Sequence, residues 1–292
     1  MKTITVLSGK GGVGKSSITA SLAVAMSKEN KIICADCDVD ASNLALVLGV
    51  KEKDYSEWKD ISTNQKVRFD LDKCGSCRKC VDNCYFNAID WINNRPRLRE
   101  YSCEGCGVCE MLCPQNAISP YQVKNAKLGH SRTRFGFDVV SAQLKMGESG
   151  SGKVVSEVRS LAAKSPADIV LVDAAAGIGC PVIASVVGSD YIIAVTEPSP
   201  SAFSDLKRAL RLASHFRIPC GIIVNKFDLN KSQTGKILRF ARRSKIDVLA
   251  KIPYDKSFTY ALVNLEPLIV YDRSYTSMFH EIRDKVKQNI GL

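Results

Sequence analysis

Eight of the twelve cysteines lie close together in the chain, at the spacing of metal ligands. The pattern Cys-x2-Cys-x2-Cys-x3-Cys occurs twice, 29 residues apart, and each copy is followed shortly by Asn-Ala-Ile. Because thiolates bind soft metals, the repeat predicts iron-sulfur clusters, with zinc as the alternative and a disulfide framework as a weaker one. The first copy contains Cys74, Cys77, Cys80 and Cys84, and the second contains Cys103, Cys106, Cys109 and Cys113.

The repeat resembles that of bacterial ferredoxins with two [4Fe-4S] clusters, in which the fourth ligand of each cluster comes from the other copy. In this chain Cys113 is followed by Pro114, as in that pattern, whereas Cys84 is followed by Tyr85. The tyrosine is expected to alter solvent access to the cluster that Cys84 helps to hold. The resemblance implies that cluster I is held by Cys74, Cys77, Cys80 and Cys113, and cluster II by Cys103, Cys106, Cys109 and Cys84.

Basic residues surround this segment, unlike the acidic surface of typical soluble ferredoxins. A basic rim would steer an acidic redox partner toward the clusters, and a solvated face with counter-ions is the alternative. No element with interleaved aromatic residues suggests a nucleic-acid site, so no nucleic-acid partner is expected. The basic residues are Lys66, Arg68, Lys73, Arg78, Lys79, Arg95, Arg97, Arg99, Lys124, Lys127, Arg132 and Arg134.

A glycine-rich segment near the N-terminus has the composition and context of a phosphate-binding loop. It follows an apolar strand and precedes a helix-compatible stretch, residues 16–27. Inward backbone N–H groups and the following helix N-terminus would hold phosphate oxygens, Lys15 would contact the β and γ phosphates, and the Ser16 hydroxyl would bind Mg²⁺. The predicted nucleotide-binding residues here are Gly9, Lys10, Gly11, Gly12, Val13, Gly14, Lys15, Ser16 and Ser17.

The early lysine of this loop, Lys10, resembles the deviant Walker A lysine of the MinD/ParA superfamily, which includes the nitrogenase iron protein and the cytosolic iron-sulfur scaffold ATPases. In that family the lysine reaches the phosphates bound by a partner subunit, much as an arginine finger does. The resemblance implies an ATPase that acts as a homodimer, with Lys10 and Lys15 as catalytic cations. An exposed loop charge is the alternative for Lys10.

Two carboxylate segments extend this resemblance. The stretch from Asp36 to Asp40, followed by Asn43, resembles the family's switch I, which implies that Asp38 orients the attacking water. Asp36 and Asp40 remain alternatives for that role, and a solvated loop end or an Mg²⁺ site is another interpretation of these aspartates. Asp173 ends an apolar strand and suits the carboxylate that holds Mg²⁺ through water.

The segments after Asp173 carry weaker signals. Switch II is expected at Gly177, and residues 174–176 are alanines where relatives with a ferredoxin insert commonly have Gly-Pro-Pro. The loss of two prolines is expected to loosen this loop. The resemblance implies that Asn225 and Pro253 contact adenine. Residues 225–228 also spell the Asn-Lys-x-Asp element of GTP-binding proteins, so GTP is the alternative to ATP.

Short β-branched apolar runs alternate with helical stretches and therefore predict a parallel sheet buried on both faces. The expected strands cover residues 4–7, 32–35, 169–172, 191–195 and 221–224. The cysteine segment interrupts this alternation. The predicted fold is α/β, a MinD-like P-loop ATPase domain with a mostly parallel sheet flanked by helices, formed by residues 1–62 and 121–292. A bacterial-type two-cluster ferredoxin domain is predicted to be inserted at residues 63–120.

The composition is that of a folded protein, with 292 residues, 45% of them hydrophobic, and a formal charge of +11 that favours anionic partners. Neither a signal peptide nor an apolar run of about 18 residues is present, so the cytoplasm is the expected location. The apolar stripe of the final helix, from Phe279 to Ile290, is expected to pack on the parent domain rather than anchor it to membrane. Cys180 is expected to be a buried structural thiol rather than a ligand of a bridging cluster.

These features favour ATP-gated electron transfer, in which ATP, Mg²⁺ and two [4Fe-4S] clusters act in a homodimer. Electrons would come from an acidic carrier and pass to a metalloprotein acceptor. An ATPase that assembles iron-sulfur or metal cofactors is the alternative, although fully Cys-ligated clusters favour permanent sites. A redox-sensing spatial regulator of MinD type is a third hypothesis.

Overall fold

The apolar runs form one large sheet in the computed structural model, which describes residues 1–51, 54–55 and 57–292. Its strands are β1 (Lys2–Ser8), β2 (Ile32–Cys37), β3 (Glu57–Ile61), β8 (Ala126–Arg132), β9 (Asp138–Leu144), β10 (Ile169–Ala176), β11 (Tyr191–Thr196), β12 (Cys220–Asn225) and β13 (Asp247–Ile252). Among the described residues, these nine strands lie in the order β13-β12-β11-β1-β10-β2-β9-β8-β3. All neighbours from β13 to β9 are parallel, and β8 and β3 extend one edge in antiparallel fashion. Each of the five predicted runs lies inside a strand of this sheet.

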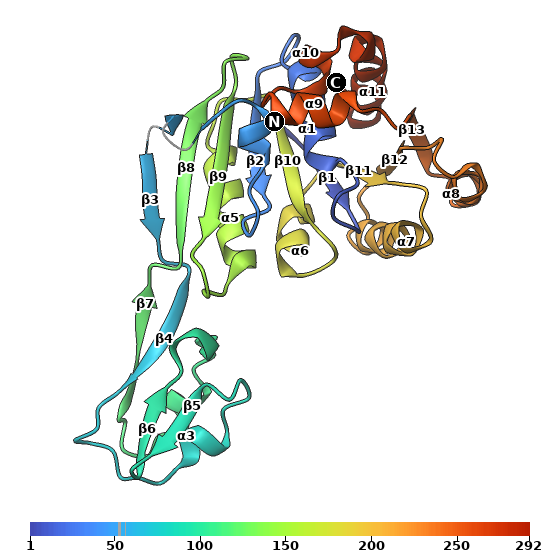
Figure 1. Cartoon of the computed structure of the whole chain (residues 1–292). Coiled ribbons are helices and arrows are strands. Elements are labelled where there is room, and N and C mark those ends of the chain that lie inside the picture. Colours follow the sequence, from blue (N-terminus) through green and yellow to red (C-terminus); the bar gives the residue numbers. More distant parts are fainter. Residues whose placement is uncertain (52–53, 56) are drawn as a thin grey trace.

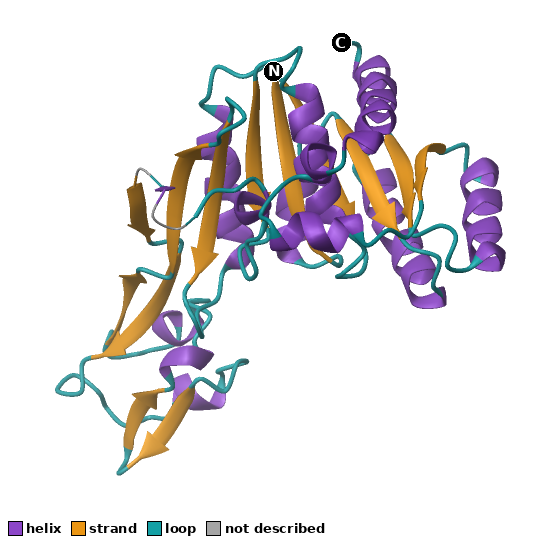
Figure 2. Ribbon diagram, turned by 45° about the horizontal axis from the view of Figure 1, so that its top comes forward, coloured by secondary structure: helices purple, strands orange, loops and turns teal. Residues whose placement is uncertain are grey.

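Helices cover both faces of the sheet (Figure 2). One layer contains α1 (Lys15–Met26), α2 (Leu44–Val47), α9 (Ser257–Val263), α10 (Leu268–Tyr271), the 3-10 turn η3 (Arg273–Tyr275) and α11 (Thr276–Ile290). The opposite layer contains α5 (Ser151–Ala163), α6 (Cys180–Val186), α7 (Pro200–His215) and α8 (Lys231–Arg243). Side chains alternate along β10, so Leu171 packs with the first layer and Val172 with the second. The predicted mostly parallel sheet flanked by helices is confirmed.

The final helix α11 lies along α1. Its apolar residues Phe279, Ile282, Val286 and Ile290 are all buried in the core shared with α1. The expectation that this stripe packs on the parent domain is therefore confirmed. Within the described ranges, no helix is both long and apolar enough to cross a membrane.

The cysteine segment forms a small unit that projects from one edge of the large sheet (Figure 1). Its elements are β4 (Asn64–Phe69), α3 (Lys79–Asp82), β5 (Ile89–Ile92), β6 (Arg95–Leu98), the 3-10 turn η2 (Glu100–Ser102), α4 (Val108–Met111) and β7 (Ile118–Val123). Strands β4 and β7 pair in antiparallel fashion, as do β5 and β6. The antiparallel pair of β4 and β7 connects this unit to the large sheet. Because β7 ends at Val123, the unit extends past the expected boundary at residue 120.

Candidate functional site

The predicted phosphate loop connects β1 to α1 at the carboxyl edge of the parallel strands, where α/β sheets bind ligands. Gly12 and Gly14 have φ angles of 78° and 91°, which side chains rarely adopt. A Cβ atom on Gly14 would lie 2.5 Å from Nδ2 of Asn225, and one on Gly9 would lie 2.5 Å from the backbone of Asp205. The loop therefore needs glycine both for its turns and for its close packing.

Asp173 joins the predicted catalytic lysine to the predicted magnesium ligand. Its Oδ1 lies 2.8 Å from Nζ of Lys15, and its Oδ2 accepts a hydrogen bond of 2.6 Å from the Ser16 hydroxyl. The hydroxyl of Thr19 also donates to Oδ1, at 2.8 Å. The arrangement fits Mg²⁺, because the hydroxyl and the carboxylate meet beside the phosphate loop. Thr19 was not among the predicted residues, although it lies one helical turn after Lys15 and on the same face.

Asp36, near the end of β2, is a structural hydrogen-bond acceptor. Asp36 is fully buried, and its Oδ2 accepts from the Ser42 hydroxyl at 2.7 Å and from the Leu44 amide at 2.9 Å. Burial raises the pKa of Asp36 to about 7, and the nearby negative charge of Asp173 adds to this rise. Since Asp36 already shapes this turn, it is poorly placed to orient a water molecule.

Asp38, the predicted water-orienting residue, lies just beyond the end of β2 and is half-buried. Burial raises its pKa, and the positive charge of Lys15 opposes that rise. Asp40 is exposed. Of these three aspartates, Asp38 thus combines partial exposure with electrostatic contact to the lysine of the phosphate loop.

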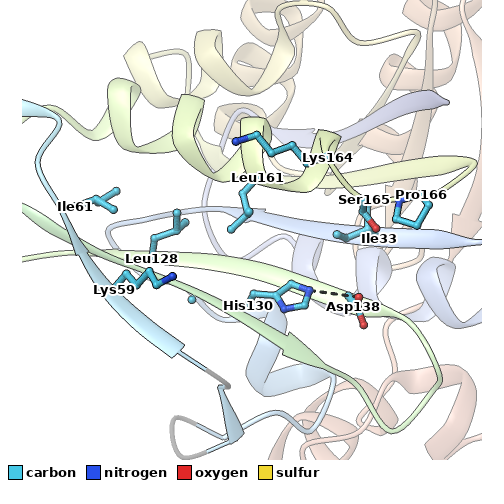
Figure 3. A pocket seen from close by; sticks show the side chains of 11 residues that line it. Ile33, Lys59, Ile61, Leu128, His130, Asp138, Leu161, Lys164, Ser165 and Pro166 are labelled. Carbon is cyan, nitrogen blue, oxygen red and sulfur yellow. Dashed lines mark hydrogen bonds and ion pairs between the residues drawn. The ribbon is translucent and has the colours of Figure 1, made fainter.

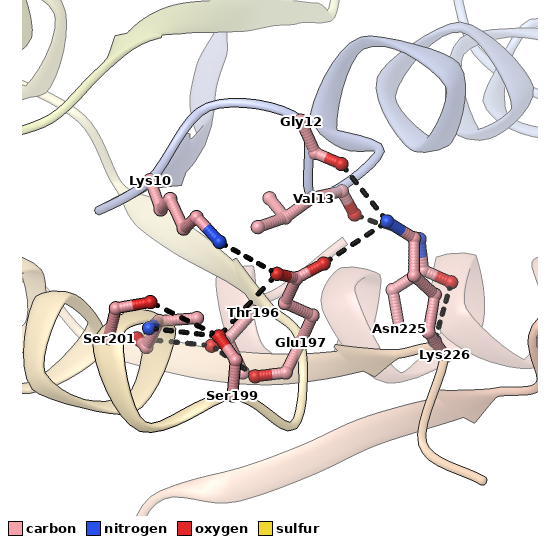
Figure 4. A network of polar contacts seen from close by, with 10 residues as sticks. Lys10, Gly12, Val13, Thr196, Glu197, Ser199, Ser201, Asn225 and Lys226 are labelled. Carbon is pink, nitrogen blue, oxygen red and sulfur yellow. Dashed lines mark hydrogen bonds and ion pairs between the residues drawn. The ribbon is translucent and has the colours of Figure 1, made fainter. Parts of the chain in front are cut away.

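Lys10 is held within its own chain by a carboxylate that sequence reasoning missed. Its Nζ lies 3.0 Å from Oε1 of Glu197, the residue after β11 (Figure 4). The other oxygen of Glu197 contacts Nζ of Lys226 at 3.1 Å, and that same amine donates to the Gly12 carbonyl. Lys10 is therefore engaged with its own chain in this structure.

The residues predicted to contact the base lie at the ends of β12 and β13. Asn225 is 2% exposed, and its Nδ2 donates to the Val13 carbonyl at 2.8 Å, so it also supports the phosphate loop. Pro253 is half-buried directly after β13. Beside it, the Tyr254 amide donates to Asp228 Oδ1 at 2.7 Å. The carboxylate that would read guanine is thus engaged with the backbone.

The switch II segment differs from the sequence expectation. The three alanines do not form a loosened loop, because Ala174 to Ala176 continue β10, and Ala174 and Ala175 are buried. Small apolar side chains fit the strand better than prolines, which cannot donate to a ladder. The turn follows at Gly177, whose φ is 102° and whose amide donates to the Ser8 carbonyl.

Cys180 is exposed at the start of α6, so the expectation of a buried structural thiol is wrong. Its side chain lies against Gly152 near the start of α5. The other three cysteines outside the repeat are not exposed: Cys34 and Cys37 are buried, and Cys220 is partly buried.

The eight cysteines of the repeat form two rings of four. One ring, called ring I, lines a hollow and consists of Cys74, Cys77, Cys80 and Cys113. The second, called ring II, lines another hollow and consists of Cys84, Cys103, Cys106 and Cys109. The fold therefore brings together the same two groups that the sequence predicts, with the fourth cysteine of each exchanged between copies.

The two rings share local contacts and a thiol-only composition. In each copy a backbone amide donates to a cysteine Sγ at 3.3 Å, from Ala88 to Cys84 and from Ala117 to Cys113. Burial raises the pKa of Cys109 to about 11, and the thiolates of its own ring add to the rise. Among the described residues, no three potential ligands converge on a single metal ion. Four thiols are a donor set that suits a [4Fe-4S] cluster and also a Zn²⁺ ion.

A further cavity of ≈ 510 Å³ lies between α5 and the β3 edge of the large sheet (Figure 3). Its walls include Ile33, Leu128 and Leu161, and at its side His130 Nε2 lies 3.3 Å from Asp138 Oδ2. This cavity shares no residue with the phosphate loop or the cysteine rings.

The large sheet, the loop after β1 and the Lys15–Asp173 pair define a P-loop nucleotide-binding protein. The chain belongs to the CobQ/CobB/MinD/ParA nucleotide-binding domain family, whose profile matches residues 4–268. This confirms the MinD/ParA resemblance.

Relatives of this chain include a protein of Methanocaldococcus jannaschii, "Uncharacterized protein MJ0578". It is 35% identical over 277 residues, which cover 87% of this chain and 95% of the relative. The fold is similar to that of the septum site-determining protein MinD complexed with Mg-ADP from Pyrococcus horikoshii, with a TM-score of 0.62, 20% identity, and coverage of 99% of this chain and 97% of that one. MinD in the MinC:MinD complex of Aquifex aeolicus gives a TM-score of 0.61 at 18% identity, with 99% and 96% covered.

Proposed function

We propose that this protein is a MinD-type ATPase that couples nucleotide-dependent dimerisation to electron transfer through two [4Fe-4S] clusters. The acceptor would be a metalloprotein. The observation that carries the proposal is the pair of four-cysteine rings on a unit attached to the sheet of a nucleotide-binding domain. Rings I and II would each hold one cluster, which when bound supplies a site for one-electron oxidation and reduction.

The nucleotide site supports an ATPase role for named residues. Backbone N–H groups of the loop would hold the phosphates, and Lys15 would exchange its contact with Asp173 for the β and γ oxygens. Ser16 and Asp173 would hold Mg²⁺, which when bound neutralises phosphate charge. Asp38 would orient the attacking water, and Lys10 would leave Glu197 to contact the nucleotide of a partner subunit. Asn225 and Pro253 would lie beside the base.

A chain of contacts links this site to the cysteine unit. Switch II leads into α6, where Cys180 packs against Gly152 of α5. The loop before α5 in turn contacts the small unit, because Glu148 Oε1 lies 2.8 Å from Nζ of Lys66 on β4. In the same loop, Gly147 lies against the ring of Tyr101. A change in switch II could therefore move the cysteine unit.

Anaerobic spectroscopy tests the proposal. The purified protein should contain about eight irons and eight sulfides per chain, the number required by two [4Fe-4S] clusters. After reduction with dithionite, its electron paramagnetic resonance signal should change when Mg-ATP is added. A signal that does not change when Mg-ATP is added would contradict the coupling between nucleotide and clusters. A purified chain that holds zinc in place of iron would contradict the electron-transfer role. Rapid transfer of the clusters to an apo-acceptor would instead favour the cofactor-assembly alternative.

A further inference from the structure

On the basis of the function proposed above, we propose that an acidic electron-carrier protein docks beside ring I, in the groove between β4 and β6, and does not dock at ring II. The two rings differ in the charge around them and in the surfaces that adjoin them.

The charge around the two rings has opposite sign. Arg78 and Lys79 line the hollow of ring I, whereas Glu104 lines that of ring II. The difference extends through the flanking segments, because residues 68–99 contain seven basic and four acidic residues. Residues 100–117 contain three glutamates and neither lysine nor arginine. A negatively charged protein is therefore attracted to ring I and repelled from ring II.

A groove of ≈ 540 Å³ lies next to ring I. Phe69 and Pro96 line both this groove and the hollow of ring I, so a partner seated in the groove would be separated from that hollow by these two side chains. The exposed residues Arg68 and Arg97 flank the groove, and exposed Leu71 supplies apolar surface. An apolar floor with cations at the rim is the composition of a docking site for an acidic protein.

Ring II instead adjoins the connection to the large unit. The Gln65 side chain donates to the carbonyl of Gly105, which lies between two cysteines of ring II. Close by in the chain, Tyr101 lies against Gly147 of the ATPase domain. Helix α3, which contains Cys80 of ring I, lies at the far end of the small unit (Figure 1). When the reduced carrier is docked in the groove, it loses one electron and the cluster at ring I gains that electron. No bond or proton changes place in this step.

The test uses the anaerobically purified full-length protein and, as a probe, an acidic plant-type [2Fe-2S] ferredoxin. The groove variant Arg68→Glu/Arg97→Glu is compared with Lys28→Glu/Lys231→Glu, which makes the same charge change at exposed sites outside the groove and the basic rim. Binding of the oxidised probe is measured by titration calorimetry at about 50 and 300 mM salt. The rate of electron transfer from the reduced probe is measured by stopped flow.

We expect the groove variant to weaken binding at low salt by about tenfold or more and to lose most of the salt dependence, while the control changes by less than about threefold. Arg68→Lys/Arg97→Lys should restore most of the binding. Equal binding by the groove variant and the wild type, with both cluster-loaded, would overturn the docking site and leave the proposed function intact. Absence of iron from the wild-type protein would overturn both.

Discussion

Asp36 and Asp38 lie two residues apart but have different environments. Asp36 is enclosed by the turn that it shapes, and its buried carboxyl faces the charge of Asp173. Asp38 is half-buried and interacts with Lys15. The turn therefore uses the Asp36 carboxyl for its own hydrogen bonds and leaves the Asp38 carboxyl partly exposed.

Asp36 should make stability depend on pH in the nucleotide-free protein. Its pKa is raised to about 7 in the folded state, against about 3.9 when unfolded. Between these values the folded state retains a proton that the unfolded state releases, so stability falls as pH rises from about 4 to 7. Urea unfolding of Asp36→Asn should show a smaller loss of stability between pH 5 and 8, by at least about 1.4 kcal/mol. The exposed control Asp40→Asn should keep the wild-type slope. An unchanged slope in Asp36→Asn would contradict the assignment.

Glu197 should restrain dimerisation by holding Lys10. The variant Glu197→Gln removes the charge that pairs with Lys10, and the pair is partly exposed, so the gain is modest. We expect dimerisation with a non-hydrolysable ATP analogue to strengthen by roughly two- to fivefold, measured by sedimentation velocity. The matched control is Glu266→Gln, which removes a similar ion pair with Arg134. Weaker dimerisation of Glu197→Gln would show that Glu197 serves the dimer instead.

At the scale of elements, the two cysteine repeats depend on each other. Each short helix, α3 or α4, follows two cysteines of its own ring, and the last cysteine of each repeat crosses to the other ring. Neither repeat could complete a ring by itself. Two internally equivalent halves therefore form one cooperative unit around the shared small core of Val67, Ile89, Cys109 and Ile118.

Substitution of one cysteine that crosses between the repeats should remove the cluster of one ring and keep the cluster of the other. Cys113→Ala should reduce the iron content from about eight to about four per chain and leave the ring II signal, because Cys113 belongs to ring I although its repeat supplies ring II. Iron analysis and electron paramagnetic resonance would measure this. Cys220→Ala, outside both rings, should retain all iron. If Cys113→Ala instead lost the ring II signal and retained the ring I signal, the assignment of Cys113 to ring I would be contradicted.

The elements best predicted from sequence are those with a strong local signal. The central strands are apolar and β-branched because both of their faces are buried, and the phosphate loop combines glycines with two lysines. Strands β8 and β9 lie near the sheet edge and carry mixed side chains such as His130 and Asp138, which hide their periodicity. The sequence also does not reveal that Glu197 meets Lys10, because such pairing depends on tertiary contacts between distant segments.

At the scale of the whole molecule, a buried ion pair connects the small unit to the nucleotide-binding domain. Lys66 was expected on the basic surface, but it is 1% exposed and pairs with Glu148. Asn64 and Asn125 support the same contact, since each donates to Ser149. The joint is therefore a packed, polar interface and not a free linker.

Breaking one side of this pair should cost more than replacing both. Glu148→Gln leaves Lys66 buried without its counter-charge, so we expect a loss of about 3 kcal/mol in unfolding free energy. The double variant Lys66→Met/Glu148→Leu should recover much of that stability, yet weaken the effect of Mg-ATP on the cluster signals. Urea unfolding and electron paramagnetic resonance would measure the two effects separately. Additive losses in the double variant would contradict the pairing.

The two places where the small unit leaves and rejoins the large sheet are neighbours. Ile61, the last residue of β3, is paired with Ala126, the first residue of β8. A tight Asn-Gly turn could close that hairpin directly, because antiparallel strands need only a short connection. All residues between Ile61 and Ala126 therefore form one long connection within the β3–β8 hairpin of the large sheet. The cysteine unit thus enters the large sheet at a single hairpin, and all nine strands of that sheet lie outside it.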